Sequence, residues 1–258
     1  MRDIRIVFFD IDGTLVDPAT RGISQKTRET LHLLRERGKI LCVVTGRPPA
    51  SLPDFGDLHF DVFSTFNGSL CTAGEKIIYS NPISREAVAQ VLKNAAGIGR
   101  PVSVAVRHRL VANGLDPDLA DYYRLADLEL TVAEDFAEAC REPVYQIMLG
   151  CRKMDHPAII QDVQGVKIAI SWDRAVDVIP ADSGKGTAIA HILSHYHLQP
   201  DQALAFGDSY NDLEMLQAVG TGVAMGNAAQ ALKDVAEDVC DSVSEDGIYR
   251  YCISHGLI

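Results

Sequence analysis

The segment that most constrains this chain is an apolar run that ends in two aspartates. Residues 6–9 contain no polar side chain, which predicts a strand buried on both faces. Asp10 and Asp12 follow it, and Gly13 permits a tight turn after them. In an open parallel sheet the ligand crevice lies at the carboxyl ends of the strands, so both carboxylates are expected there. Because adjacent carboxylates repel each other, such a site requires a cation, a raised pKa, or both.

An acidic pair before a glycine also occurs in calcium loops and in plain surface turns. An EF-hand loop needs a third acidic or amide ligand before its glycine and a glutamate that closes the loop. Here Gly13 comes too early, and a hydrophobic strand precedes the pair. The pattern therefore favours a carboxylate site at a strand end over a calcium loop.

Composition and charge limit the class of protein. The 258 residues are 47% hydrophobic, enough for a sizeable core at a length near which chains divide into two domains. The net charge of −11 argues against nucleic acid and anionic membranes as partners. No apolar run reaches the length of a membrane span, and the N-terminus lacks a signal peptide's apolar region. The six scattered cysteines form no CxxC pair, so we expect reduced thiols in a cytoplasmic protein.

Strands and helices alternate at the beginning of the chain. A helix over about 25–37, with Ser24 as its cap, leads to a second strand over 39–44. A third strand is predicted over 61–66, and a hairpin arm over 76–79. Strand, helix and strand in this order form the unit of a parallel sheet with a right-handed crossover.

The same alternation returns after residue 183. The expected elements are a helix over 188–195, a strand over 203–206, a helix over 213–218, a strand over 221–225, and helices over 228–236 and 248–253. Residues 83–180, between these two parts, have a different sequence pattern. They contain short strands and two helical stretches, and no polar motif follows a strand there. The sequence therefore predicts an α/β protein: a Rossmann-like parallel core from residues 1–82 and 181–258, with a smaller inserted α+β domain over 83–180.

Polar motifs recur at or near the strand ends of the predicted core. Besides the first pair they are Thr45, Lys185, and Asp208 with Asn211 and Asp212. Carboxylate oxygens suit Mg²⁺, and a hydroxyl, backbone N–H groups and an ammonium can hold a phosphoryl group. One carboxylate is left to act as a nucleophile. The set therefore makes chemical sense as one phosphoryl-handling site.

Two shorter motifs fail on spacing. Residues 183–187 are similar to the end of a nucleotide-binding P-loop, but Ile179 stands where its first glycine is required. Residues 220–226 approach a dinucleotide fingerprint, but their last glycine comes one residue late. The eight histidines show no metal-ligand pattern, so we expect ordinary core or surface imidazoles.

Four motifs in this order resemble those of the haloacid dehalogenase superfamily. They are Asp10-x-Asp12-Gly13-Thr14-Leu15, Thr45-Gly46-Arg47, Lys185-Gly186 and Gly207-Asp208-x-x-Asn211-Asp212. The insertion resembles, in size and position, the large α/β cap (type IIB) of the Cof-type sugar-phosphatase branch, which Asn67-Gly68 also fits. The resemblance covers nearly the whole predicted core.

The resemblance implies a magnesium-dependent phosphatase that forms an aspartyl-phosphate. Asp10 would be the nucleophile. Asp12 would protonate the leaving alkoxide and then activate water. An aspartate at position 12 favours a phosphatase over a dehalogenase, because the leaving group of a phosphate ester needs a proton. The inserted cap would close over the crevice and read the leaving group.

The resemblance also implies the ligand sets. The Mg²⁺ ligands would be Asp10, Asp12 through its backbone carbonyl, and Asp208. The phosphoryl oxygens would be held by Thr45, the Gly46 N–H, Lys185 and Asn211. Asp212 would support Lys185 or a metal-bound water. Arg47 would reach the substrate or the cap, or would form only a surface ion pair.

The expected substrate is a small phosphorylated metabolite, with sugar phosphates as the leading class. A phosphosugar mutase and a non-catalytic metabolite sensor remain as alternatives. A receiver domain also combines acids, a threonine and a lysine, but it is far shorter and has no inserted domain. The protein is expected to be a monomer or a homodimer.

Overall fold

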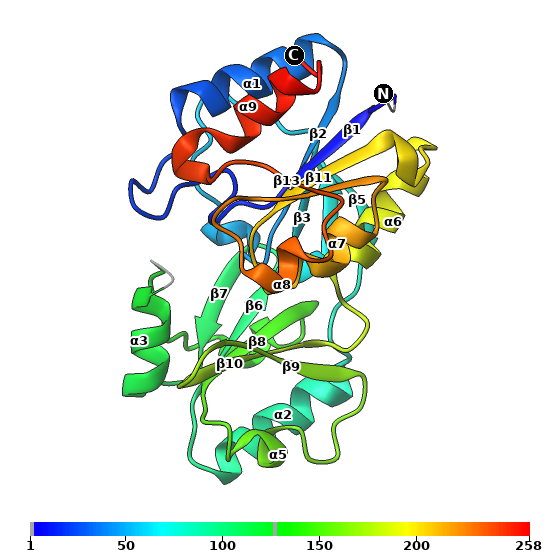
Figure 1. Cartoon of the computed structure of the whole chain (residues 1–258). Helices are drawn as coiled ribbons and strands as arrows, with labels where there is room; N and C mark the ends of the chain where they lie inside the picture. Colours follow the sequence, from blue (N-terminus) through cyan, green and yellow to red (C-terminus); the bar gives the residue numbers. More distant parts are fainter. Residues whose placement is uncertain (1–2, 126–127) are drawn as a thin grey trace. The chain divides into compact units, whose positions relative to one another are not determined.

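The protein is described by a computed structural model that covers residues 3–125 and 128–258. The chain forms two compact units (Figure 1). The core unit comprises Met1–Gly46, Pro53–Ser80 and Gly184–Ile258, and the inserted unit comprises Arg47–Leu52 and Asn81–Ser183. Within the described ranges, no helix combines the length and apolarity needed to cross a membrane.

The core unit is built on a mostly parallel sheet, eight-stranded over the described residues, in the order β13-β12-β11-β1-β2-β3-β4-β5. The strands are β1 (Ile6–Phe9), β2 (Ile40–Val44), β3 (Val62–Thr65), β4 (Leu70–Ala73), β5 (Lys76–Ser80), β11 (Ala203–Gly207), β12 (Thr221–Ala224) and β13 (Asp238–Val239). Neighbouring strands from β13 to β3 run parallel, whereas β4 and β5 are antiparallel additions. The predicted α/β class is confirmed.

Strand β1 occupies the middle of this sheet and is buried along its whole length. Phe9 lies opposite Phe206 of β11 and Val43 of β2, so the three strands end at the same level. The residues that follow them therefore meet at one edge of the sheet, as the crevice rule for parallel sheets requires.

Helices cover both faces of the core sheet. They are α1 (Gln25–Glu36), α6 (Lys185–Tyr196), α7 (Leu213–Gln217), α8 (Gln230–Lys233) and α9 (Gly247–Ser254). Ile6 and Phe8 belong to the cluster that includes Ile189 of α6. On the other face Phe9 stacks on Phe206, whose ring meets Tyr251 of α9 edge-on. Alternate residues of a strand point to opposite faces, so the apolar run 6–9 serves both layers.

Two helices of the core unit differ from their predicted extents by more than one residue. Helix α6 begins at Lys185, three residues earlier than expected, because Gly184 is extended and serves as its N-cap. Helix α8 is shorter than the predicted 228–236, because Asn227 holds the preceding segment as a loop. Its Nδ2 donates to the Gly13 carbonyl oxygen, and its Oδ1 accepts the Val243 N–H, both at 2.9 Å. Alanine content alone therefore overestimates this helix.

The inserted unit has an antiparallel sheet, five-stranded over the described residues, in the order β7-β6-β8-β10-β9. The strands are β6 (Val102–Val106), β7 (Arg109–Ala112), β8 (Val144–Gly150), β9 (Val166–Trp172) and β10 (Ala175–Pro180). Helices α2 (Arg85–Gly97) and α5 (His156–Ile159) pack on one face through Val91 and Ile159. The short helix α4 (Phe136–Ala139) lies beside β7.

Helix α3 (Pro117–Leu125) packs on the other face of the same sheet, against β8 and β10. The Tyr123 hydroxyl is hydrogen-bonded to the hydroxyl of Ser103, which alternates along β6 with the residues facing α2. The neighbouring Tyr122 hydroxyl donates to the buried Asp177 carboxylate of β10, at 2.9 Å. A helix-borne hydroxyl therefore satisfies a carboxylate that the sheet buries.

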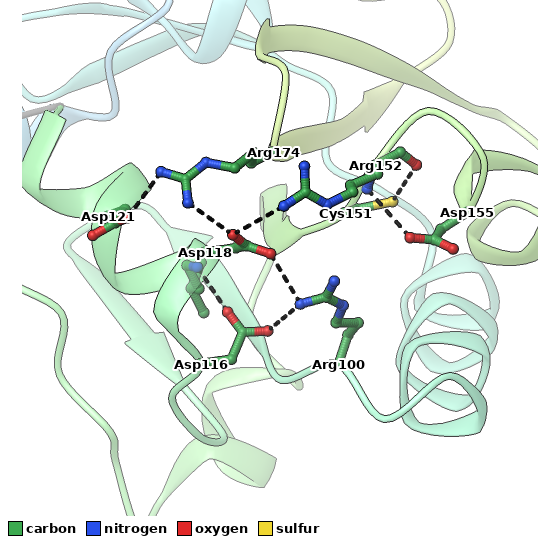
Figure 2. A network of polar contacts seen from close by, with 9 residues as sticks. Arg100, Asp116, Asp118, Asp121, Cys151, Arg152, Asp155 and Arg174 are labelled. Atoms are coloured by element: carbon green, nitrogen blue, oxygen red, sulfur yellow. Dashed lines mark hydrogen bonds and ion pairs between the residues drawn. The ribbon is translucent and has the colours of Figure 1, made fainter.

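A network of ion pairs fixes the first turn of α3 (Figure 2). Arg100 Nη1 contacts Asp116 Oδ2 at 3.0 Å and Asp118 Oδ2 at 3.2 Å. Arg174 Nη1 reaches Asp118 Oδ1 at 3.2 Å, and its Nη2 reaches Asp121 Oδ2 at 2.9 Å. Because the Asp118 side chain is only 13% exposed, solvent screens these contacts less than ordinary surface pairs.

We therefore expect Asp118→Asn to lower the free energy of unfolding by about 1–2 kcal/mol, because the neutral amide keeps an acceptor for only one of the guanidinium groups of Arg100 and Arg174 and a negative charge for neither. Urea unfolding followed by circular dichroism measures this loss. Glu129→Gln changes an exposed carboxylate of the same unit and should stay within about 0.5 kcal/mol of the wild type. Equal urea midpoints for Asp118→Asn and the wild type would show that the network adds no stability.

Candidate active site

The centre of the site is a buried lysine held between two carboxylates. Lys185, in the first turn of α6, donates from Nζ to Asp10 Oδ1 and to Asp212 Oδ1, each at 2.6 Å. Asp10 follows β1, and Asp212 closes the short turn between β11 and α7. All three side chains are buried, with Lys185 and Asp212 at 1% and 0% exposure. Three distant segments thus converge on one ammonium group.

Asp212 also organises the loop that follows β11. Its Oδ2 accepts the backbone N–H groups of Asp208 and Ser209, at 3.0 and 2.9 Å. A Cβ atom at Gly207 would lie 2.6 Å from Asp212 Cβ, so glycine is required for the loop to fold back this closely. Both Asp212 oxygens are therefore engaged, one by Lys185 and one by this loop.

Asp208 connects that loop to the one after β1. Its Oδ1 accepts a hydrogen bond from the Thr14 hydroxyl at 2.9 Å, and its Oδ2 accepts one from Ser209 Oγ at 3.3 Å. Gly13 has a φ of +83°, and a Cβ atom there would lie 2.3 Å from Asp208 Oδ2. The glycine of the first motif is therefore needed both for the turn and for the approach of Asp208.

The three carboxylates form a set suited to a metal ion. Asp10, Asp208 and Asp212 each offer an oxygen, and these oxygens lie within 4.8 Å of one another. Burial raises the pKa of Asp10 strongly, with Lys185 opposing the rise and Asp212 adding to it. Burial also raises the pKa of Asp208 to about 6. Burial alone would lower the pKa of Lys185, but Asp10 and Asp212 together raise it.

These shifts have one electrostatic cause: one ammonium serves three carboxylates in a desolvated site. A divalent cation with a preference for oxygen ligands would offset the remaining negative charge. Asp10 and Asp208 are the more available ligands, because Asp212 is held by the Lys185 ammonium and two backbone N–H groups, whereas Asp208 accepts from the hydroxyls of Thr14 and Ser209. Among the described residues, Asp10 Oδ2 accepts no hydrogen bond. The donor set thus fits a metal site of the kind that Mg²⁺ occupies.

A second group of residues lies at the ends of β2 and β3. Thr45 and Gly46 follow β2, and the Thr45 side chain is buried. The Asn67 N–H donates to the Thr45 carbonyl oxygen at 3.0 Å. Asn211 Nδ2, from the loop after β11, donates to Asn67 Oδ1 at 3.1 Å. Asn67 therefore links the predicted phosphoryl-binding residues Thr45 and Gly46 to Asn211.

The structure thus connects most of the predicted residues by direct contacts, and it adds Asn67. The available signal for Asn67 was an Asn-Gly pair directly after a predicted strand. Asp12 is exposed, two residues beyond Asp10. Arg47 belongs to the inserted unit, where its Nη1 donates to the Ser51 carbonyl oxygen at 2.8 Å. The roles of all these residues stay predictions.

Comparison with known proteins identifies the family. The sequence pattern of the haloacid dehalogenase-like hydrolases matches residues 7–252. The chain belongs to this family. YkrA of Bacillus subtilis strain 168 is similar to this hydrolase, with 31% identity over 267 residues that cover 99% of each chain. The 5-amino-6-(5-phospho-D-ribitylamino)uracil phosphatase YitU of the same strain is 27% identical and covers 95% of each chain.

Solved structures agree with these sequence matches. The haloacid dehalogenase subclass IIB sugar phosphatase BT4131 is 27% identical to this hydrolase, with a TM-score of 0.85, over 98% of this chain and all of the other. The predicted superfamily, its Cof-type branch with a type IIB cap, and the enzyme class, a phosphatase acting on phosphoric monoesters, are confirmed.

Proposed function

We propose that this hydrolase is a magnesium-dependent phosphatase that works through a phosphoryl group carried on Asp10. The observation that carries the proposal is the buried Asp10–Lys185–Asp212 group with Asp208 beside it. A carboxylate held by one oxygen and free at the other is a positioned nucleophile. Magnesium bound by Asp10, Asp208 and the Asp12 carbonyl would neutralise charge on Asp10 and on the phosphoryl oxygens, so that two anions can react.

The proposed reaction has two steps. An Asp10 oxygen attacks phosphorus while the bond from phosphorus to the ester oxygen breaks, and Asp12 gives its proton to the leaving alkoxide. The Asp12 carboxylate then takes a proton from water, whose oxygen attacks the same phosphorus. Inorganic phosphate leaves, and Asp10 regains its carboxylate. The exposed position of Asp12 supports its role in both proton transfers.

The remaining residues hold the phosphoryl group. The transition state of phosphoryl transfer is loose and places charge on the equatorial oxygens, so positioning and charge neutralisation supply most of the catalysis. Lys185 provides the positive charge. Thr45, the Gly46 N–H and Asn211 provide hydrogen-bond donors. Asp212 aligns Lys185 through the 2.6 Å contact.

The relatives support a small phosphorylated metabolite as the substrate. YitU is a phosphatase of a phosphoribitylamino compound, and BT4131 is a sugar phosphatase. We therefore propose sugar phosphates and related polyol phosphates as the first class to test. A protein with a net charge of −11 repels such anions, so the metal and Lys185 must reverse the field locally.

We expect the purified protein to release phosphate from p-nitrophenyl phosphate and from a panel of sugar phosphates. EDTA should lower the rate by at least about 100-fold, and excess Mg²⁺ should restore it. An undiminished rate in EDTA would contradict the metal requirement. Isomerised phosphosugar in excess of free phosphate would identify a mutase instead, and tight binding without turnover across the panel would identify a sensor.

A further inference from the structure

The turn between β3 and β4 has an unusual backbone. Phe66, Asn67 and Gly68 follow one another with φ values of 53°, 52° and 91°. The left-handed conformation suits Asn-Gly, but it costs a bulky residue such as Phe66 about 1–2 kcal/mol. Such strain persists only where the surroundings impose it, and here the Phe66 ring is completely buried. A short hairpin connection does not by itself require left-handed backbone at three successive residues, so the turn alone does not explain the conformation of Phe66.

The conformation brings the turn against each of the phosphoryl-binding segments of the core unit. Asn67 donates its N–H to the Thr45 carbonyl oxygen at 3.0 Å. Its side chain covers Gly46, where a Cβ atom would lie only 3.0 Å from Asn67 Oδ1. The same Oδ1 accepts the hydrogen bond from Asn211 Nδ2 at 3.1 Å. One half-buried amide therefore touches two of the segments at once.

Gly68 supplies the contact with the third segment. A Cβ atom on Gly68 would lie 2.2 Å from the carbonyl oxygen of Gly184, the residue directly before Lys185. Only glycine permits this approach. The turn is thus packed between the ends of β2 and β3 and the start of α6.

We propose that Asn67 is a positioning residue of the phosphoryl pocket. Its backbone N–H holds the Thr45 carbonyl oxygen, and its side-chain Oδ1 packs against Gly46 and orients the Asn211 amide. This inference rests on the proposed phosphatase function, because the groups that Asn67 aligns are the ones assigned to the phosphoryl oxygens. The strained backbone at Phe66 places the Asn67 amide between Gly46 and Asn211, and we infer that this placement is the reason for the strain.

Asn67→Gly separates this role from a structural one. Glycine adopts the left-handed conformation without strain, so the variant should unfold at an equal or higher urea concentration than the wild type. Misplaced binding groups are costly in catalysis, so kcat/KM for p-nitrophenyl phosphate should fall by about 10-fold or more. The inhibition constant of inorganic phosphate should rise by a similar factor. A turn that only connects β3 to β4 would leave both kinetic values unchanged.

The matched control is His197→Gly, which replaces another left-handed residue of the core unit, an exposed one at the end of α6. It should leave the kinetics within about two-fold of the wild type. A double-mutant cycle with Asn211→Ala tests the route of the effect, because Asn211 is exposed and its truncation spares the core. If Asn67 acts through Asn211, the double variant loses clearly less than the product of the two single losses.

Wild-type turnover tests the proposed function separately. If the wild type releases no phosphate from any substrate, that function fails, and the inference is then decided by the thermal stabilisation that inorganic phosphate confers with Mg²⁺ present. A smaller stabilisation for Asn67→Gly than for the wild type and His197→Gly supports the inference. Wild-type kinetics of Asn67→Gly would overturn the inference. If the wild type is inert, equal stabilisation of Asn67→Gly and the wild type by phosphate would overturn it. Fully additive losses in the cycle of Asn67→Gly and Asn211→Ala would also overturn it.

Discussion

Asp10→Asn should abolish turnover, with a loss in kcat/KM of at least about 10³-fold, because removing a nucleophile eliminates the covalent step itself. The amide keeps the size of the side chain and still accepts the hydrogen bond from Lys185 Nζ, so the fold should persist. Stopped assays of phosphate release, at enzyme concentrations that detect residual activity, measure the loss. Asp201→Asn, an exposed aspartate of the core unit, is the control and should match the wild type.

The same variant should be more stable than the wild type in metal-free buffer. Burial raises the pKa of Asp10 above its ordinary value of 3.8, so between the two pKa values the folded state binds more protons than the unfolded state. Wild-type stability contributed by this group therefore falls as the pH rises above about 4. The amide does not ionise, so the advantage of Asp10→Asn should be larger at pH 8 than at pH 5. Normal turnover by this variant, or a stability difference of the opposite sign, would contradict the assignment.

Lys185→Met should damage both activity and stability. The variant leaves Asp10 and Asp212 buried with no cation between them, and removing one partner of a buried ion pair costs about 3–5 kcal/mol. It also removes the charge proposed to hold the phosphoryl oxygens, so kcat/KM should fall by at least about 10³-fold. Urea unfolding and phosphate release measure the two effects.

Lys39→Met is the matched control for this variant. Lys39 is half-buried in the same unit, and its Nζ donates to a neutral acceptor, the Ile4 carbonyl oxygen, at 2.6 Å. Its loss should cost about 1 kcal/mol and leave the kinetics unchanged. If Lys185→Met lost no more stability than Lys39→Met, the buried group of Asp10, Lys185 and Asp212 would not stabilise the fold as we expect.

Much of the core sheet could be predicted from the sequence, because buried parallel strands are continuous apolar runs. Strand β1 is the clearest case, since each of its residues is apolar and each is buried. Strand β10 of the inserted unit is harder to predict, because Asp177 interrupts its apolar run. The Tyr122 hydroxyl, 55 residues away in the chain, satisfies this carboxylate, and no local pattern reveals such a partner. Strand β13 has only two residues and carries no periodicity.

In the candidate site, too, some residues could be predicted from the sequence and the contacts between their side chains could not. Asp10 and Asp208 could be predicted to meet because the parallel strands β1 and β11 end at one edge of the sheet. Lys185 instead begins α6 and follows no strand of that sheet, so its motif, and not a strand end, is what indicates it. The sequence does not specify the side-chain positions on which two features of the site depend. Lys185 contacts both Asp10 and Asp212, and Asp212 accepts two backbone N–H groups of its own loop. The sequence indicates Asn67 only as part of a family pattern. Its importance depends on a left-handed backbone and on a contact with Asn211, 144 residues later in the chain.

The most direct test of the account is to trap the phosphoryl group on the enzyme. The protein is mixed with substrate and Mg²⁺, quenched in acid during steady-state turnover, digested with pepsin at low pH, and its peptides are weighed and fragmented. The account predicts one added phosphoryl group on the peptide that contains Asp10, located at Asp10 itself and absent from Asp10→Asn. Full turnover with no phosphorylated peptide, or with the phosphoryl group on a different residue, would contradict it.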